Sequence, residues 1–247
     1  MFHIFGPRFW PLLILLGLVV LFFLLMGVLL LITFFACLLE KQRIRDFVPA
    51  MPEELPPASP YFRSMSEYAR LLGYQPGGMF GQNRESSMYR VYLGLWLATD
   101  QKSLLCIASG KLARVPYKRT FLISRLPDDT SLVTMDAFGS EDISGTRNIE
   151  VLMNADLNEL TQLHQRRLAM AGVEPLPFSN NRLAELEQWN RTRADRLVAG
   201  GFAKYTDDNT WHFTLKGAIL HTYKAQLRGL ARASAQKERM QIRRPGG

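Results

Sequence analysis

The feature that most constrains this chain is an uninterrupted apolar stretch near its N-terminus. Between Leu12 and Leu39 there is no charged residue, only Leu, Ile, Val, Phe, Met, Gly, Ala and single Thr and Cys residues. These 28 residues would form a helix of roughly 42 Å, whereas the hydrocarbon core of a bilayer is about 30 Å thick. The stretch therefore predicts one transmembrane helix, residues 12–39, and is too short for two.

A cleaved signal peptide is the alternative interpretation of this stretch. Signal peptides have an apolar region of about 7–15 residues that ends in a small-x-small cleavage site. The segment "LITFFACLLEKQR" contains no such site, and Phe34 and Phe35 precede Cys37 where a lipoprotein site requires small aliphatic residues. We therefore expect the helix to remain in the mature protein, with Cys37 as a small residue facing the membrane.

Basic residues on either side of the helix predict its orientation. Arg8 stands alone before the apolar stretch, whereas Lys41, Arg43 and Arg45 follow it closely. Lys and Arg in short flanking segments are retained on the cytoplasmic side of a membrane. We therefore expect a single-pass protein of the cell membrane with its soluble part in the cytoplasm. Cys106 is the only thiol outside the apolar stretch, so no disulfide can form within the soluble part, which agrees with that compartment.

The remaining residues predict an α+β fold arranged in successive parts. Five prolines between residues 48 and 60 favour an extended chain, so we expect a Pro-rich linker, residues 40–60, that holds the domain away from the bilayer. A β-rich part, residues 61–154, follows. A helical part with a β-hairpin is expected at 155–230, and a disordered basic tail at 231–247. The formal charge of +8 belongs mostly to the chain end, because residues 224–247 carry seven Lys or Arg and one Glu.

Within the β-rich part, apolar residues alternate with a period of two between residues 88 and 154. Five such segments, separated by clusters of Asp, Gly, Pro or Ser, predict an antiparallel meander. The segment "YRVYLGLWLA" has large apolar residues in both phases, so we expect a central strand covered on both faces. A short helix, residues 64–72, precedes these strands, and the glycines at 77, 78 and 81 are interpreted as a flexible connection.

The helical part has clear start and stop signals. Asp156 is a suitable N-cap and Gly172 a suitable C-terminal stop for one helix, and a second is expected at 182–199 before Gly200 and Gly201. A hairpin follows, and then a last helix from Thr214 to about residue 233.

Three side chains are the candidates for catalysis. Asp136 and Asp142 lie in the polar loop "TMDAFGSEDISGTRN", and His164 lies on a predicted helix. Paired carboxylates can divide acid and base roles or ligate a hard cation, and a histidine can act as a general base. The alternatives are solvated turn carboxylates and a core histidine bonded to the backbone. Metal-binding and nucleophile motifs such as HExxH, CxxC and GxSxG are absent, so neither a cofactor nor a metal is expected.

Residues 198–220 resemble the wing and following helix of winged-helix DNA-binding domains. The matching features are Gly200-Gly201, the polar turn Asp207-Asp208-Asn209, the aromatic residues Trp211 and Phe213, and Thr214-Leu215-Lys216-Gly217. The resemblance implies a recognition helix at 182–199, with Arg191, Arg193 and Arg196 as candidate DNA contacts. Two features depart from the family: a nine-residue connection with two prolines before that helix, and a net charge of only +1 on it.

The last helix predicts an amphipathic contact surface. Leu215, Ile219, Tyr223, Leu227 and Leu230 mark an apolar stripe, with His221 and basic residues on the other side. Anionic lipid attracts such residues by about 1 kcal/mol each near a membrane surface. The candidate residues for lipid or partner contact are Lys224, Arg228, Arg232, Lys237, Arg239, Arg243 and Arg244. A solvated face with a disordered end is the alternative.

Three hypotheses about function follow. The favoured one is a membrane-anchored scaffold or accessory protein that binds a protein partner and catalyses nothing, with anionic lipid as a further partner. The second is a membrane-anchored DNA-binding regulator, although nucleic acid is the disfavoured partner on charge. The third is an enzyme that combines the loop at 136–145 with His164.

Overall fold

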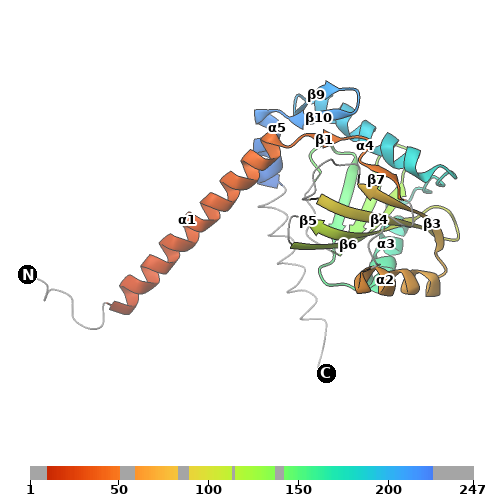
Figure 1. Ribbon diagram of the computed structural model, residues 1–247, viewed down its shortest axis with the longest axis horizontal. Coiled ribbons are helices and arrows are strands. Elements are labelled where there is room, and N and C mark those ends of the chain that lie inside the picture. The colour runs from red at the N-terminus through yellow and green to blue at the C-terminus, as the bar shows by residue number, and fades with distance from the viewer. Residues whose placement is uncertain (1–9, 51–58, 83–88, 113–114, 137–141, 225–247) are drawn as a thin grey trace, which may run out of the picture.

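The computed structural model of the protein describes residues 10–50, 59–82, 89–112, 115–136 and 142–224. They form the expected α+β fold with one long N-terminal helix (Figure 1). The helices are α1 (Trp10–Leu39), α2 (Pro60–Leu71), α3 (Leu157–Ala171), α4 (Arg182–Ala199) and α5 (Leu215–His221). The strands are β1 (Gln42–Arg43), β2 (Phe47–Pro49), β3 (Gln75–Gln82), β4 (Tyr89–Leu97), β5 (Leu104–Leu112), β6 (Val115–Arg125), β7 (Ser131–Met135), β8 (Arg147–Val151), β9 (Ala203–Asp207) and β10 (Thr210–Phe213).

Helix α1 projects away from the rest of the molecule (Figure 1). Within its segment Leu13–Leu39, an 18-residue stretch has a mean hydropathy of 3.2 and no buried residue. By length and composition this segment is able to cross a membrane, although a signal sequence meets the same criteria.

A seven-stranded sheet forms the centre of the domain, in the order β2-β3-β4-β5-β6-β7-β8. Neighbouring strands are antiparallel except the last pair, β7 and β8, which is parallel. The predicted meander is therefore correct up to β7, but its final connection runs in the other sense.

The interpretation of residues 77–81 as a flexible connection is wrong, because these residues belong to β3. Glycine is needed here for close packing. A Cβ on Gly77 would lie 3.0 Å from the carbonyl oxygen of Leu95 on the neighbouring strand. Gly78 has a φ of +121° next to a register shift, where a side chain would be strained.

Both faces of the sheet are covered, as the pattern in β4 predicted. Leu95 and Leu97 point to the face that α4 covers, where they pack with Phe178 and Leu186. Trp96 points to the opposite face, which α2 and α3 cover. The sheet is thus the middle layer between α4 on one side and α2 with α3 on the other (Figure 1).

A smaller unit surrounds the end of α1. Strands β9 and β10 form the predicted hairpin, and β1 adds a third strand beside β10. Thr214 caps α5, as predicted, by accepting a hydrogen bond from the amide of Gly217. A Cβ on Gly217 would lie only 1.8 Å from the carbonyl oxygen of Phe202, so only glycine allows this close approach of α5 to the hairpin.

The prediction of an extended linker at 40–60 is wrong for its first half. Residues 42–43 pair with β10 and residues 47–49 pair with β3, so this segment joins both sheets. Between them, Ile44 is only 1% exposed and its amide donates to the carbonyl oxygen of Asn209. Residues 51–58 lie outside the described residues. Helix α2 begins at Pro60, earlier than the predicted start at 64, because Ser59 caps it.

The predicted starts and ends of α3 and α4 are confirmed. Asp156 and Glu159 form a capping box at the start of α3, and Gly172 ends it in the left-handed conformation. Asn181 caps α4, which runs over the expected residues 182–199.

Candidate functional site

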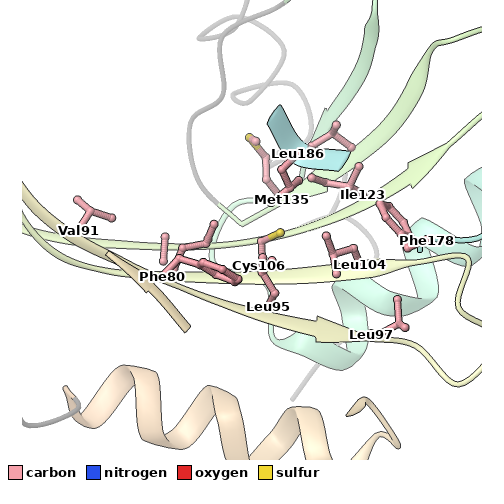
Figure 2. Packing of buried hydrophobic residues seen from close by; sticks show 13 residues of the cluster. Phe80, Val91, Leu95, Leu97, Leu104, Cys106, Ile123, Met135, Phe178 and Leu186 are labelled. Carbon is pink, nitrogen blue, oxygen red and sulfur yellow. The ribbon is translucent and has the colours of Figure 1, made fainter. Parts of the chain in front are cut away.

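A cavity of about 540 Å³ lies between the large sheet, helix α4 and the chain segment that follows α1. Its floor is the α4-facing side of the sheet, and includes Leu93, Cys106, Ala108, Val133 and Met135. Figure 2 shows this apolar face, with Cys106 and Met135 on the side of the sheet away from α2. A cavity of this size with an apolar floor is typical of small-molecule sites, which measure about 300–1,000 Å³.

Charged side chains also line this cavity. Four arginines contribute, against two carboxylates: Arg43, Arg119, Arg147 and Arg193, with Glu40 and Asp46. They come from the segment after α1, from β6, from β8 and from α4. Elements far apart in the sequence therefore form one amphipathic cavity, which combines an apolar floor with predominantly basic charged side chains.

Arg147, at the start of β8, is the most enclosed of these arginines. Its guanidinium lies over the Trp189 ring at 3.6 Å from the centroid, and its Nη2 donates to Asn190 Oδ1 at 3.0 Å. Its Nε is buried and has no hydrogen-bond partner among the described residues. Burial, reinforced by the nearby Arg193, lowers the pKa of Arg147, while Asp142 opposes this shift. An arginine nevertheless stays charged at neutral pH because its ordinary pKa is so high.

Asp142, a predicted catalytic candidate, instead binds backbone amides of the segment that leads into β8. Its Oδ2 accepts the amides of Thr146 and Arg147 at 3.0 Å each, and its Oδ1 accepts Arg193 Nε at 3.3 Å. Burial alone would raise the pKa of Asp142, but Arg193, the Ser144 hydroxyl and Arg147 together lower it below its ordinary value. The carboxylate is 1% exposed, so it is a structural anion and not an accessible acid or base.

The other catalytic candidates lie elsewhere. His164 is buried on the α3 side of the sheet, where Ser124 Oγ lies 3.0 Å from Nε2 and Thr134 Oγ1 lies 2.9 Å from Nδ1. Burial, with Arg167 nearby, lowers the pKa of His164 to about 3. It is therefore the core histidine of the alternative interpretation, although its partners are hydroxyls and not backbone groups.

Asp136 is held by Tyr61 of α2 and by the backbone of β6. Its Oδ1 accepts the amide of Thr120 at 2.8 Å, and its Oδ2 accepts the Tyr61 hydroxyl at 3.1 Å. Burial raises the pKa of Asp136. Since Asp142 bonds to α4 on one side of the sheet and His164 sits under α3 on the other, the structure does not bring the three candidates together. Asp142 and His164 therefore do not line one cleft.

The three candidate DNA contacts do not share an exposed face. Arg193 turns inward, pairing with Asp142 and lying over the Trp211 ring at 5.4 Å. Arg191 donates to the carbonyl oxygen of Asp208 at 3.0 Å, and Arg196 to that of Asp128 at 3.4 Å. Each is thus used within the domain.

The predicted amphipathic helix is described only as far as residue 224. Leu215, Ile219 and Tyr223 are 60%, 56% and 50% exposed, so the apolar stripe faces outward. His221 stacks on Phe213, and burial, with Arg193 nearby, lowers its pKa to about 4. It is neutral at pH 7 and does not belong to a basic edge. Lys224 is half-buried, and the remaining candidate contacts lie outside the described residues: Arg228, Arg232, Lys237, Arg239, Arg243 and Arg244.

Sequence reasoning missed the cavity and its arginines, although one signal was present. In "YKRTFLIS", Arg119 occupies the same phase as Tyr117 and Phe121, so the alternation places a charge on an apolar face. Across the described part of the chain, no group of three or more His, Cys, Asp or Glu side chains could hold a metal ion.

No family model, curated protein or solved structure matches this chain. The resemblance of residues 198–220 to a winged-helix wing therefore stays a prediction.

Proposed function

We propose that the protein is a single-pass membrane protein whose domain is fixed at the membrane surface, where it acts as a non-catalytic scaffold or accessory binding protein. One observation carries this proposal: the last turns of α1 belong to the core of the small unit. Phe34, Cys37 and Leu38 pack against the cluster that contains Trp211, Phe213 and Leu197. The helix is thus both the anchor and a part of the domain.

This packing favours a retained helix over a cleaved signal sequence. Cleavage after the apolar stretch would remove three side chains from the core, and their apolar contacts would be replaced by water. A segment intended for removal has no reason to complete the mature core. The packing and the lack of a cleavage site in the sequence therefore both favour a retained helix.

The junction between α1 and the domain is short. Only Glu40 and Lys41 separate the end of α1 from β1, and the amide of Glu40 continues the helical bonding to Ala36. The domain therefore follows the helix at the bilayer surface without a spacer. The basic residues Lys41, Arg43 and Arg45 favour the cytoplasmic surface.

Helix α5 supports the same placement. It contacts α1, and its exposed Leu215, Ile219 and Tyr223 form an apolar patch beside the end of the membrane helix. Such a patch at this position is suited to the headgroup region of the bilayer.

Two pairs of neighbouring residues test the proposal in the full-length protein. Phe34 packs on the core while Phe35 is 52% exposed, and Leu38 packs on the core while Leu39 is 75% exposed. We expect Phe34→Ala with Leu38→Ala to lower the thermal stability of the domain in detergent micelles, and the control Phe35→Ala with Leu39→Ala to leave it nearly unchanged. Equal effects of the two double variants would show that α1 is not part of the core.

Membrane retention is tested separately. The mature protein should keep its N-terminal helix by intact mass and should remain with membranes after alkaline carbonate extraction. A chain truncated after residue 39, or released into the supernatant, would contradict the proposal. A C-terminal fluorescent reporter that matures only in the cytoplasm should be active, and an inactive reporter would reverse the orientation.

A further inference from the structure

We propose that the cavity between α4 and the large sheet binds an anionic amphiphile, a molecule with one apolar chain and a carboxylate or phosphate head, that enters from the membrane. This proposal goes beyond the scaffold function, since a scaffold needs no internal site. It rests on three observations: an apolar floor, an arginine with a buried, unpaired nitrogen beside it, and lining residues that directly follow α1.

The apolar floor provides the site for the chain of the ligand. Leu93, Ala108 and Arg119 are neighbours across β4, β5 and β6, with Ala108 in the middle. Because alanine is small where the flanking strands carry larger side chains, the floor is lowest at this position. Val133 and Met135 of β7 extend the apolar surface. An alkyl chain laid here would remove its own apolar surface from water, which is favourable in proportion to the apolar area buried.

The arginines provide the site for the head. The Nε of Arg147 is buried and has no hydrogen-bond partner among the described residues, and the guanidinium stacks on Trp189, which holds its plane in one orientation. Its nearest carboxylate, Asp142, is engaged by Arg193 and by backbone amides, so it does not fully neutralise the charge. Buried charges are normally paired. An anionic head beside Arg147 would supply that pairing, and planar guanidinium groups suit carboxylate and phosphate in particular. Arg119 lines the same cavity.

The position of the cavity next to α1 points to the bilayer as the source of the ligand. Glu40, Gln42 and Arg43 line the cavity, and Glu40 directly follows the last residue of α1. One part of the cavity wall therefore lies next to the end of the proposed membrane helix. An amphiphile in the bilayer has its head at this level, so its entry requires little movement along the membrane normal.

Fluorescence quenching provides a direct test, because Trp189 and Trp211 both line the cavity. The full-length protein, carrying Trp10→Phe to remove the tryptophan at the start of α1, would be placed in phosphatidylcholine nanodiscs and titrated with 9,10-dibromostearate. Bromine quenches tryptophan at short range. We expect saturable quenching by the acid, and at least roughly tenfold weaker binding of its methyl ester, which lacks the charge.

Four variants locate the binding site. Arg147→Gln and Arg119→Gln should each weaken binding of the acid about tenfold or more, as expected for loss of a charge-assisted hydrogen bond. Ala108→Phe should abolish saturable quenching by filling the floor, and Ala108→Leu serves the same purpose if the larger side chain prevents folding. Arg166→Gln is the matched control, because Arg166 is exposed on α3 and bonds only within its own helix. It should leave binding unchanged.

Competition distinguishes the two sources of the anionic head. Displacement by lysophosphatidic acid in preference to oleate would identify a phosphate lipid, and the reverse order would identify a fatty acid. Three results would overturn the proposal: equal binding of the acid and its ester, quenching that Ala108→Phe and Ala108→Leu leave unchanged, or failure of both competitors. Because this assay reports binding and not anchoring, its failure would leave the placement of the domain at the membrane intact.

Discussion

Two polar clusters on opposite faces of the large sheet differ in how fully their groups are paired. Beneath α3, His164 bonds to Ser124 and Thr134, and Arg167 reaches Thr134 and the backbone of β7. Beneath α4, Arg147 keeps an unpaired nitrogen beside about 540 Å³ of space. A fully paired network stabilises a fold, whereas a buried nitrogen without a partner next to a cavity costs stability, and this cost motivates the proposed ligand.

The largest expected effect comes from breaking the paired face. His164→Ala removes one hydrogen-bond partner from each of the Ser124 and Thr134 hydroxyls in a buried site and also creates a small cavity. We expect a loss of about 2–4 kcal/mol in the free energy of unfolding, measured by urea denaturation of the full-length protein in micelles. A loss below about 1 kcal/mol would mean that the network adds little to stability.

Acid should weaken the same face without any mutation. The pKa of His164 is about 3 in the folded protein, against an ordinary value of about 6.5 when unfolded. Only the unfolded chain takes up this proton between these values, so stability falls as the pH drops from about 6.5. By pH 4.5 the histidine alone should cost about 2–3 kcal/mol.

His221, whose pKa is about 4, acts in the same direction. Denaturation curves recorded between pH 7 and 4.5 should therefore show declining stability, and His164→Gln should reduce the slope. An unchanged slope in this variant would assign the acid sensitivity to other groups.

Close packing beneath α2 gives a third, smaller effect. A Cβ on Gly94 would lie 2.6 Å from Cζ of Phe62. Gly94→Ala should therefore cost about 1–2 kcal/mol, because the phenyl ring of α2 has to move. The same variant with Phe62→Leu should recover most of that loss. If it recovers none, the strain lies in the backbone of β4 and not in the contact.

The smallest effect is expected on the face with the cavity. Ala108→Leu adds methyl groups where space exists, so it should change stability by less than about 1 kcal/mol, and filling the cavity favours a gain. The same change in a closely packed core would cost about 1–3 kcal/mol. A loss of that size, seen by thermal unfolding, would show that the α4 face is packed as tightly as the α3 face.

The sequence predicted those features that a local pattern determines. The period of two in β4 identified a strand covered on both sides, Asp156 and Gly172 set the limits of α3, and Thr214 marked the start of α5. Each of these signals lies within a few residues of the structure it specifies. The apolar composition of residues 12–39 likewise required no tertiary information.

Features that depend on distant partners were missed. Strands β1 and β2 contain two and three residues, and they are strands only because β10 and β3 supply the hydrogen bonds. The glycines of β3 were interpreted as a loop because glycine is common in loops. Their role is instead to let β3 lie close to Leu95 of the neighbouring strand. The cavity joins β6, β8, α4 and the segment after α1, and no local spacing reports that these elements meet.

The short segment after α1 has a mechanical consequence. One run of residues contributes an edge strand to each sheet and is joined to the helix by Glu40 and Lys41 alone. A change in the tilt of α1, such as a thicker or thinner bilayer imposes, cannot be absorbed by slack chain. It would pull on the two edge strands together and shift the wall that Glu40, Gln42 and Arg43 form. With α1 in a bilayer as proposed, the thickness of the bilayer and the shape of the cavity are coupled through the backbone.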